Sequence, residues 1–552
     1  MLKGLTIFRS ISQNNIKFSI STRLNSAIIV MNRRTFHGKS QKPFAVTNNG
    51  QKSNETKPNI PQQERNSVEP VGSSVVKTYW NDISNYTHEP GLFSLGESET
   101  QRVVPSEQYI LEHLRSVINL GQTHGDLVPS VITKKCCELY ESLDEIGKAG
   151  FLKLMSEEFG APREDITRAA RHYVDITSNR TEGAEKATLR ALQILNQTLA
   201  PPYNRFFDHV NKLPGGMRFL VDMRSDMLEI LSHDKSNMNV ASMNDALMEK
   251  LQGWLLGFLE LERITWNSPA ATLEKLAQYE AVHAFSNWDD LKRRVGRGRR
   301  CFGFFHRNMP NDPLVFVQVA LVTDISDNVQ KILNDPSPGH TNPSETIRSA
   351  IFYSITSQRG LSGVELGNFL IKRVVGVLKE EFHQIQTFCT LSPIPKFKRW
   401  LDSQLSNQRS IILLEEDAKR LSVLDGKEPL QIFQDIINSP SWFEDPKVSD
   451  AVRLPLMRLC SRYLLEQKRG HLAYDPVANF HIRNGACVHR INWLADTSEK
   501  GIEQSLGMMV NYNYILSKVE SNNHSYLKNG TIAINESDPL LLNTSLLQSK
   551  TG

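Results

Sequence analysis

The sequence predicts an all-helical domain followed by an α/β domain, the fold class α + α/β. Apolar residues recur at spacings of three and four from about Glu107 to Leu213, which is the period of an amphipathic helix. After Val295 the apolar runs become short, β-branched or aromatic, and bounded by turn residues, as in strands. A long amphipathic segment from Val364 to about Phe382 lies between strand candidates, as in α/β structure.

The front half is expected to form a helical bundle. Its apolar stripes predict core or association faces and indicate no cofactor site. The pair Pro201-Pro202 ends one helix, and Leu213-Pro214-Gly215-Gly216 predicts a domain boundary, because Pro and Gly do not extend a helix cheaply. More helices are expected after that boundary, through the segment 253–276. The apolar stripes comprise Ile110, Leu111, Leu114, Val117 and Ile118, then Leu139, Leu143, Ile146, Phe151, Leu152 and Leu154, then Leu189, Leu192, Leu195 and Leu199.

The back half contains the strand candidates. Each is a short run in which β-branched or aromatic residues predominate, and each ends near turn residues. The runs lie at 301–305, 314–321, 350–355, 387–391 and 487–493.

Charge and composition argue against several classes of protein. The formal net charge is +4, but residues 1–54 hold nine Lys or Arg and no acidic residue, which leaves 55 basic against 60 acidic residues in the remainder. A mildly acidic body argues against a nucleic-acid partner. No apolar run approaches a membrane span, so no membrane partner is expected. The six cysteines show no CxxC spacing, so neither a zinc site nor a secreted disulfide framework is indicated, and a reducing compartment is the simpler interpretation.

The N-terminal segment is predicted to be a targeting signal. Residues 1–45 are basic, Ser-rich and acid-free, with apolar residues able to form one helical face, which is typical of a mitochondrial transit peptide. A disordered basic tail is the alternative. Residues 46–100 include a polar, Pro-bearing stretch and are expected to be a disordered linker. The predicted location is therefore the mitochondrial matrix.

The most informative local feature is the strand, turn and helix over 349–382. Gly360 and Gly363 in SQRGLSGVELG let backbone N–H groups approach an anion, and the following helix N-terminus adds further donors. A pyrophosphate group fits this pattern, although glycines also end strands for steric reasons. No GxGxxG or Walker motif is present, so nicotinamide nucleotides and ATP are poor ligand candidates.

The chain resembles the malonyl-CoA decarboxylase family over about residues 100 to 530. The SQRGLSGVELG turn is similar to the acyl-CoA pyrophosphate loop of the GNAT acetyltransferase fold, and the further motifs are TLSPIPKFKRWL (390–401), PVANFHIRNGACVHRINWLAD (476–496) and GMMVNYNY (507–514). The resemblance implies a helical oligomerisation domain at 101–213, a GNAT-like catalytic domain at 214–530, a flexible tail at 531–552, and a homotetramer. It implies conversion of malonyl-CoA to acetyl-CoA and CO2, which controls the malonyl-CoA level and hence fatty-acid synthesis and oxidation.

The resemblance also implies site residues. Ser354 matches the family's catalytic serine, His481 its catalytic histidine, and Tyr514 a tyrosine in its last motif. From residue type alone, each is more often structural. The family's CoA-binding stretch corresponds to Asp324, Ile325, Ser326, Asp327, Asn328, Val329 and Gln330, and the pyrophosphate turn adds Gln358, Gly360 and Gly363 to the malonyl-CoA contacts of Ser354 and His481.

The expected chemistry requires no cofactor and no metal. Loss of CO2 leaves a thioester enolate, so the substrate supplies its own electron sink, and the protein must orient the carboxylate, stabilise the enolate and supply a proton. His481 is the expected proton donor, because imidazole titrates near physiological pH. Ser354 is expected to position the malonyl group or to accept a proton, and Tyr514 to orient His481 or the carbonyl.

Two other functions remain open. The pyrophosphate turn alone also fits an acyl-CoA-dependent N-acetyltransferase, and a catalytically inactive acyl-CoA sensor is a third possibility. Two departures from the family pattern matter. The chain ends Ser549-Lys550-Thr551-Gly552 and lacks a terminal Ser-Lys-Leu peroxisomal signal. Ala270 stands where some members carry a cysteine, so the family's intersubunit disulfides are not assumed.

Overall fold

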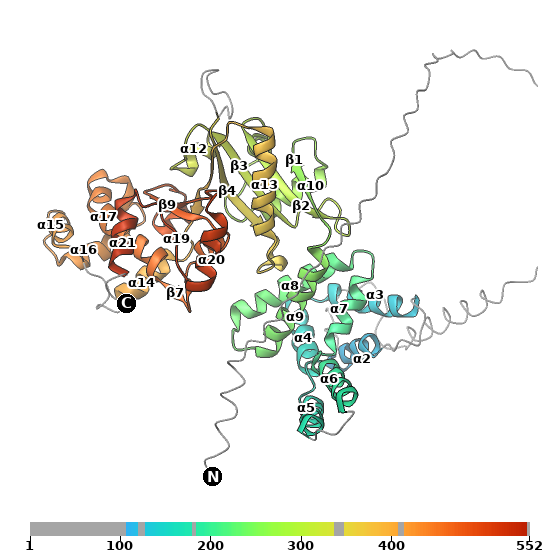
Figure 1. The fold of residues 1–552 in the computed structure, drawn as a ribbon. Helices are drawn as coiled ribbons and strands as arrows, with labels where there is room; N and C mark the ends of the chain where they lie inside the picture. The colour runs from blue at the N-terminus through green and yellow to red at the C-terminus, as the bar shows by residue number, and fades with distance from the viewer. Residues whose placement is uncertain (1–105, 120–126, 179–183, 336–346, 407–412, 549–552) are drawn as a thin grey trace, which may run out of the picture. The chain divides into compact units, whose positions relative to one another are not determined.

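The computed structural model describes residues 106–119, 127–178, 184–335, 347–406 and 413–548 (Figure 1). The predicted transit peptide at 1–45 and linker at 46–100 lie outside these ranges. The described residues fall within one structural unit, Thr100–Gly552. None of their helices is both long and apolar enough to cross a bilayer.

The front half is helical, as predicted. Side chains cap several of the helices: Ser106, Asp144 and Asn237 each accept a hydrogen bond from a first-turn N–H, which satisfies a donor that the helix leaves free. Helices continue past the boundary predicted at 213 until Leu255. They are α2 (Glu107–Ile118), α3 (Leu127–Ser142), α4 (Glu145–Glu158), α5 (Arg163–Ser178), α6 (Ala184–Leu199), α7 (Tyr203–Asn211), α8 (Gly216–His233) and α9 (Met238–Leu255).

The back half is built on one mixed sheet of eight strands. The first strand, β1, corrects an expectation, because the segment 253–276 was predicted to be helical and instead contains an edge strand paired antiparallel with β2. The alternation of apolar and charged residues in LELERI is the period-2 signal for a half-exposed strand. The strands are β1 (Leu259–Ile264), β2 (Arg299–His306), β3 (Val315–Val322), β4 (Ser349–Ser357), β5 (Thr387–Thr390), β6 (Ser392–Pro393), β9 (Cys487–Asn492) and β10 (Met509–Asn513).

The strand order is β1-β2-β3-β4-β5-β10-β6, with β9 also paired to β10, and only β4 and β5 run parallel. Their last paired residues are Phe352 and Thr390. We call the place where this pairing ends, between β4 after Phe352 and β5 after Thr390, the fork.

Helices cover both faces of the sheet. The predicted helix after β4 is α13 (Leu366–Glu381), which contacts β2 and β3 (Figure 1). The first helices of this half are α10 (Ala270–Tyr279), α11 (Trp288–Arg294), α12 (Val329–Leu333) and the short η1 (Arg359–Leu361). The later elements are α14 (Phe397–Ser406), α15 (Glu415–Ser422), α16 (Pro429–Ile437), η2 (Trp442–Glu444), α17 (Pro446–Glu466), α18 (Pro476–Arg483), α19 (Glu499–Ser505), α20 (Val519–Asn529), α21 (Pro539–Gln548) and the hairpin of β7 (Lys468–Arg469) and β8 (Leu472–Ala473).

The segment expected to be a flexible tail contains α21, which packs against α17. Leu541 is fully buried, and the Ser461 hydroxyl donates to Thr544 at 2.9 Å. Leu540 and Leu541 supply apolar side chains from α21 to the core. Residues 539–548 therefore belong to the folded body.

A β-bulge shapes the end of β4. The register between β3 and β4 shifts by one residue, so that Gln318 pairs with Ser354 and Val319 with Phe352, which leaves Tyr353 as the extra residue. The bulge places the side chains of Tyr353 and Ser354 on the same face as Gln318, whereas Phe352 packs into the opposite core with Val319. Two adjacent polar residues of β4 thus meet one polar residue of β3.

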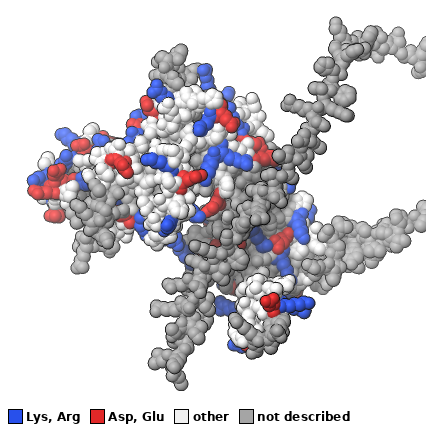
Figure 2. Space-filling model, viewed as in Figure 1, with Lys and Arg blue, Asp and Glu red and all other residues white. Residues whose placement is uncertain are grey.

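Charges of both signs are interspersed among the described residues on the face shown in Figure 2. This surface carries no broad positive field, so an anionic ligand must be bound by local groups.

Candidate functional site

The first part of the candidate site is His481, in the last turn of α18. Asp475 caps this helix by accepting from the N–H groups of Val477 at 2.9 Å and Ala478 at 3.0 Å, and Pro476 supplies a fixed φ at the first helical position. The Tyr463 hydroxyl donates to the same buried carboxylate at 3.0 Å. The motif PVANFH therefore sets the position of α18, and with it that of His481.

His481 is buried and has a hydroxyl at each ring nitrogen. Nδ1 lies 2.8 Å from the Tyr514 hydroxyl, and Nε2 lies 3.2 Å from Ser392 Oγ. The ring stacks on Tyr512 at a centroid distance of 4.7 Å. Ser392 donates its own hydrogen to Thr390 Oγ1 at 2.8 Å, so its oxygen accepts from His481. The neutral imidazole therefore carries its hydrogen on Nε2. Nδ1 is then an acceptor, and the Tyr514 hydroxyl donates to it.

Burial lowers the pKa of His481 to about 3, because the charged imidazolium is poorly solvated there. The expectation that this imidazole titrates near physiological pH therefore does not hold for the buried ring. Burial also raises the pKa of Tyr514 well above its ordinary value, so its hydroxyl stays protonated. At neutral pH the pair is an uncharged hydrogen-bonded unit.

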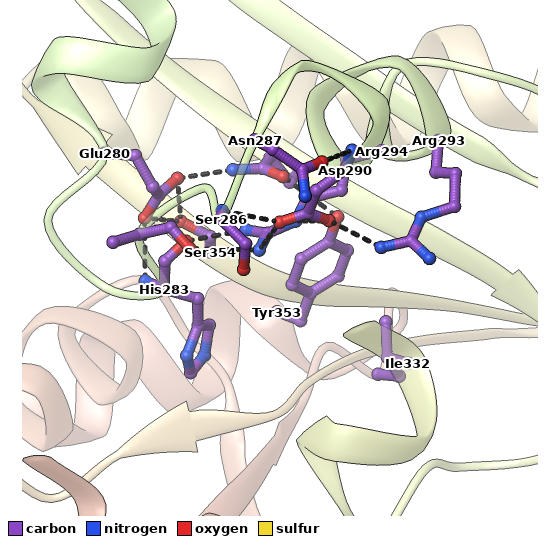
Figure 3. A network of polar contacts seen from close by, with 12 residues as sticks. Glu280, His283, Ser286, Asn287, Asp290, Arg293, Arg294, Ile332, Tyr353 and Ser354 are labelled. Carbon is purple, nitrogen blue, oxygen red and sulfur yellow. Dashed lines mark hydrogen bonds and ion pairs between the residues drawn. The ribbon is translucent and has the colours of Figure 1, made fainter. Parts of the chain in front are cut away.

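The second part of the candidate site is Ser354, which donates to Glu280. Its Oγ lies 2.8 Å from both oxygens of that carboxylate, and both residues are buried (Figure 3). Glu280 also accepts from the Gln318 side-chain amide, and the Tyr353 hydroxyl donates to Gln318 Oε1 at 2.9 Å. The bulge in β4 makes this cluster possible, because it turns Tyr353 and Ser354 to the same face.

The two parts border the same fork. Ser354 lies two residues beyond Phe352, the last residue of β4 paired with β5, and Ser392 lies two residues beyond Thr390 on the other strand. β6, which begins at Ser392, contacts β4. The structure thus brings His481 and Tyr514 into direct contact, and it places Ser354 on the opposite strand of the fork.

Sequence reasoning did not identify Glu280, Gln318 or Ser392. Glu280 stands in the unremarkable segment QYEAVH. Gln318 gave a usable signal, because it is the one polar residue in the otherwise apolar strand VFVQVALV and is almost fully buried. A buried polar side chain needs a partner, and that partner is Glu280.

The predicted pyrophosphate turn is held from the helical half. Arg224 of α8, only 1% exposed, donates to the carbonyls of Gly360 at 2.5 Å and Ser362 at 2.8 Å. A Cβ at Gly360 would lie 1.9 Å from the Val221 carbonyl oxygen, whereas Gly363 is needed for its φ of +84°. Gly360 is thus required by packing against α8.

The Gln358 side chain is already engaged within the protein. Its Nε2 donates to Asp312 Oδ1 at 2.7 Å and to the Pro313 carbonyl at 3.1 Å. The exposed Arg359 pairs with Glu229 of α8 at 2.7 Å. The backbone groups of the turn and the exposed Lys372 of α13 are the remaining candidates for anion binding.

The stretch from Asp324 to Gln330 lies at the other end of β4. It follows β3, which runs antiparallel to β4, whereas the pyrophosphate turn follows the end of β4. Contacts to the turn after β9 hold it: Val329 N–H donates to the Ala495 carbonyl at 2.8 Å, and Gln330 Nε2 donates to Asp496 at 2.8 Å. The two predicted substrate-binding segments therefore do not meet.

A cavity of about 200 Å³ lies beside β6 and β10, next to the loop that carries Glu280. His283 lines it, and its buried Nε2 has no hydrogen-bond partner in the described part of the protein. Lys500 and Asp496 line it as well. Small polar groups therefore have room on this side of the fork.

No group of three or more His, Cys, Asp or Glu among the described residues is arranged to hold a metal ion. The six cysteines are buried and unpaired, and burial raises the pKa of each thiol.

Comparison with known proteins gives a consistent result. The family model described as "Malonyl-CoA decarboxylase C-terminal domain" matches residues 257–550, and "Malonyl-CoA decarboxylase N-terminal domain" matches residues 159–255. The mitochondrial malonyl-CoA decarboxylases of Rattus norvegicus and Mus musculus are each 41% identical over 397 residues, which is 70% of this chain and 80% of theirs.

Solved structures agree. The malonyl-CoA decarboxylase of Rhodopseudomonas palustris is 31% identical with a TM-score of 0.68, covering 79% of this chain and all of that one. The corresponding protein of Agrobacterium vitis is 31% identical with a TM-score of 0.66, covering 78% of this chain and 99% of that one. The predicted order of a helical region followed by an α/β region is confirmed.

Proposed function

The chain belongs to the malonyl-CoA decarboxylase family, and from this we propose that it converts malonyl-CoA to acetyl-CoA and CO2 at the fork between β4 and β5. The supporting observation is the pair of hydrogen-bonded units that border the fork, His481 with Tyr514 and Ser354 with Glu280. By controlling the malonyl-CoA level, the enzyme would influence fatty-acid synthesis and oxidation.

We propose that His481 is the proton donor. The reaction consumes one proton, because the electron pair released with CO2 is finally protonated at the α-carbon. A malonyl carboxylate brought into the fork raises the pKa of the nearby imidazole, since an opposite charge favours the protonated form. Once CO2 has left, burial again lowers the pKa of His481, which makes the imidazolium a strong acid.

Tyr514 would support both states of His481. Its hydroxyl donates to Nδ1 of the neutral imidazole, and toward an imidazolium the same oxygen accepts from Nδ1–H. The other proton of the imidazolium, on Nε2, is on the Ser392 side and so at the fork. Tyr514 is therefore proposed to orient His481 rather than the substrate carbonyl.

Ser354 is proposed to act from the opposite strand, either by positioning the malonyl group or by accepting a proton. The CoA portion would be bound by backbone N–H groups of the Gln358–Gly363 turn. The stretch Asp324–Gln330, at the other end of β4, would contact a different part of the extended ligand. The mildly acidic body supplies no general attraction for an anion, so these local groups must provide the binding.

Incubation of the purified protein with malonyl-CoA alone tests the proposal. We expect release of CO2 and acetyl-CoA with the thioester intact. Release of free CoA only when an amine is present would instead identify an N-acetyltransferase. Binding without turnover would identify a sensor.

The variant His481→Asn is expected to bind CoA normally and to lose activity by about two orders of magnitude or more, the usual contribution of an acid–base group. His524→Asn is the matched control, because His524 is exposed on α20. Equal activity of the His481 variant and the wild-type protein would contradict the proposed role.

We further propose a mitochondrial protein that assembles into a homotetramer through its helical domain, 101–213, with catalysis in 214–530. The relatives above are named mitochondrial. In the contacting helices α5 and α6, Val174 is 55% exposed and Leu189 is 66% exposed, so apolar surface is available for a second copy. Light scattering of the Leu189→Glu variant tests this surface, and an unchanged mass would contradict it.

A further inference from the structure

We propose that Glu280 is the positioning residue for Ser354, holding the hydroxyl hydrogen away from the fork so that Oγ presents lone pairs to the reacting group. This inference rests on the proposed function, because it assumes that the malonyl group reacts beside Ser354. It assigns to Ser354 the role of an acceptor and not that of a hydrogen-bond donor to the malonyl carboxylate.

The direction of each hydrogen bond follows from a chain of fixed donors. Burial raises the pKa of Tyr353, so its hydroxyl is protonated and donates to Gln318 Oε1 at 2.9 Å. The amide of Gln318 is thereby oriented with Nε2 toward Glu280, to which it donates. Glu280 must accept this bond, and the Ser354 hydroxyl, 2.8 Å from each carboxylate oxygen, donates to it as well.

The backbone adds donors that no side-chain rotation can remove. Glu280 Oε1 accepts from the N–H of Val282 at 2.8 Å and from the N–H of His283 at 3.1 Å. The Thr356 hydroxyl lies 3.4 Å from the same oxygen. Every group around this carboxylate is therefore a donor, which is the surrounding that an ionised carboxylate requires.

The loop that carries Glu280 is fixed from two sides. Arg294 of α11, which is paired with Asp290, donates to the carbonyls of His283 at 2.6 Å and Ala284 at 3.1 Å (Figure 3). From α19, Lys500 donates to the carbonyls of Ala281 and Val282. A carboxylate held this firmly can set the geometry of Ser354 without moving when substrate binds.

The arrangement predicts how Ser354 affects the reaction. When the malonyl carboxylate faces the lone pairs of Ser354 Oγ, it has lost its hydrogen bonds to water and gains none from the serine. This raises the free energy of the bound substrate in its ground state. When CO2 leaves, the negative charge moves to the thioester oxygen, and the unfavourable contact is relieved. Glu280 is therefore expected to raise kcat without strengthening the binding of substrate.

The test is Glu280→Gln, which keeps the side-chain shape but introduces an NH2 donor. The backbone N–H groups of Val282 and His283 keep the amide oxygen at the Oε1 position, so the new NH2 takes the Oε2 position. Its neighbours there are the Gln318 NH2, which donates, and Ser354 Oγ, which can accept, so the hydrogen of Ser354 is released toward the substrate. We expect kcat to fall by about 100-fold, comparable to the loss of one preorganised hydrogen-bonding group at a reaction centre, while KM for malonyl-CoA stays equal or decreases. The dissociation constant of acetyl-CoA should not change.

The Ser354→Ala background sharpens the test. If Glu280 acts through Ser354, adding Glu280→Gln to Ser354→Ala causes little further loss of kcat. Multiplicative losses, or a raised KM with unchanged kcat, would overturn the inference. Glu274→Gln is the matched control, since Glu274 lies exposed on α10.

The melting temperature of each variant distinguishes a folding defect from a loss of catalysis. The variant Glu280→Asp provides a second check, because it keeps the carboxylate acceptor but shortens the side chain. That variant should show the same decrease in kcat, to a smaller extent, with no increase in KM; a raised KM would overturn the inference. The wild-type protein is assayed in parallel. If the wild-type protein and both Glu280 variants turn over malonyl-CoA at the same rate, the positioning role of Glu280 is refuted and the proposed function stands. If the wild-type protein does not turn over malonyl-CoA, both the proposed function and this inference are refuted.

Discussion

The Tyr514 hydroxyl lies 2.8 Å from Nδ1 of His481, and both side chains are buried. Ser392 donates its hydrogen to Thr390 and therefore accepts from Nε2, so the neutral imidazole carries its hydrogen on Nε2. Nδ1 is then the acceptor, and the Tyr514 hydroxyl, 33 positions away in the sequence, is its donor.

Tyr514→Phe is expected to lower kcat by about 10- to 100-fold, because it leaves buried Nδ1 without a partner, at a cost of about 1–3 kcal/mol. KM for malonyl-CoA should change little, since the hydroxyl contacts His481 and not the CoA moiety. Steady-state kinetics checks this. The control is Tyr474→Phe, because Tyr474 is 46% exposed. A large increase in KM without a loss of kcat would place Tyr514 in substrate binding instead.

The stability of the protein should depend on pH through His481. Its pKa is about 3 in the folded chain and 6.5 when unperturbed, so below 6.5 the unfolded state binds a proton that the folded state does not. The free energy of unfolding therefore decreases as the pH falls from 6.5 toward 3, by up to about 1.4 kcal/mol per pH unit from this residue.

Urea unfolding of the wild-type protein and of His481→Asn at pH 7 and pH 5 isolates that contribution. The stability difference between the two should shrink by about 2 kcal/mol at the lower pH, because only the wild-type protein loses this contribution. Parallel pH dependences would show that His481 is not buried in the neutral form.

Arg224 gives a prediction for CoA binding. Arg224→Met removes the donors to the carbonyls of Gly360 and Ser362 but keeps a similar apolar volume. We expect KM for malonyl-CoA to rise by about 10-fold, because each carbonyl left unsatisfied costs about 1–3 kcal/mol and the turn loses its position. kcat at saturation should be nearly unchanged. A loss of kcat at constant KM would mean that the turn does not bind CoA.

Much of the fold follows from local patterns in the sequence. Strands β2 to β5 and helix α13 were predicted because their apolar runs and flanking turn residues are strong signals. β1 was predicted to be helical, because LELERI has the composition of a helix as well as the alternation of an edge strand. The helix α21 was missed, because its burial depends on packing against α17, which lies far from it in the sequence.

The site was predicted only in part. His481, Tyr514 and Ser354 follow from the family resemblance, but Glu280 lies 74 residues before Ser354 and meets it only through a bulge in β4. A bulge shifts one strand by one residue, and no residue in AIFYSIT marks it. The pKa of His481 was also beyond the sequence, because it depends on burial, which is a property of the packed structure.

Alanine substitutions at two glycines, one in the turn before α13 and one within α13, should change the stability of the protein in opposite directions. Gly360→Ala would place a methyl group 1.9 Å from the Val221 carbonyl oxygen, which is backbone and cannot give way, so the turn or α8 must move. We expect a loss of several kcal/mol in the free energy of unfolding, as for overpacked or strained sites, together with an increased KM for malonyl-CoA. Gly376→Ala, in the exposed part of α13, meets no atom within 4 Å and should instead stabilise the protein by about 0.5–1 kcal/mol. Chemical denaturation of both variants checks the opposite signs. If Gly360→Ala were as stable as the wild-type protein, the close contact between α8 and the pyrophosphate turn would be refuted.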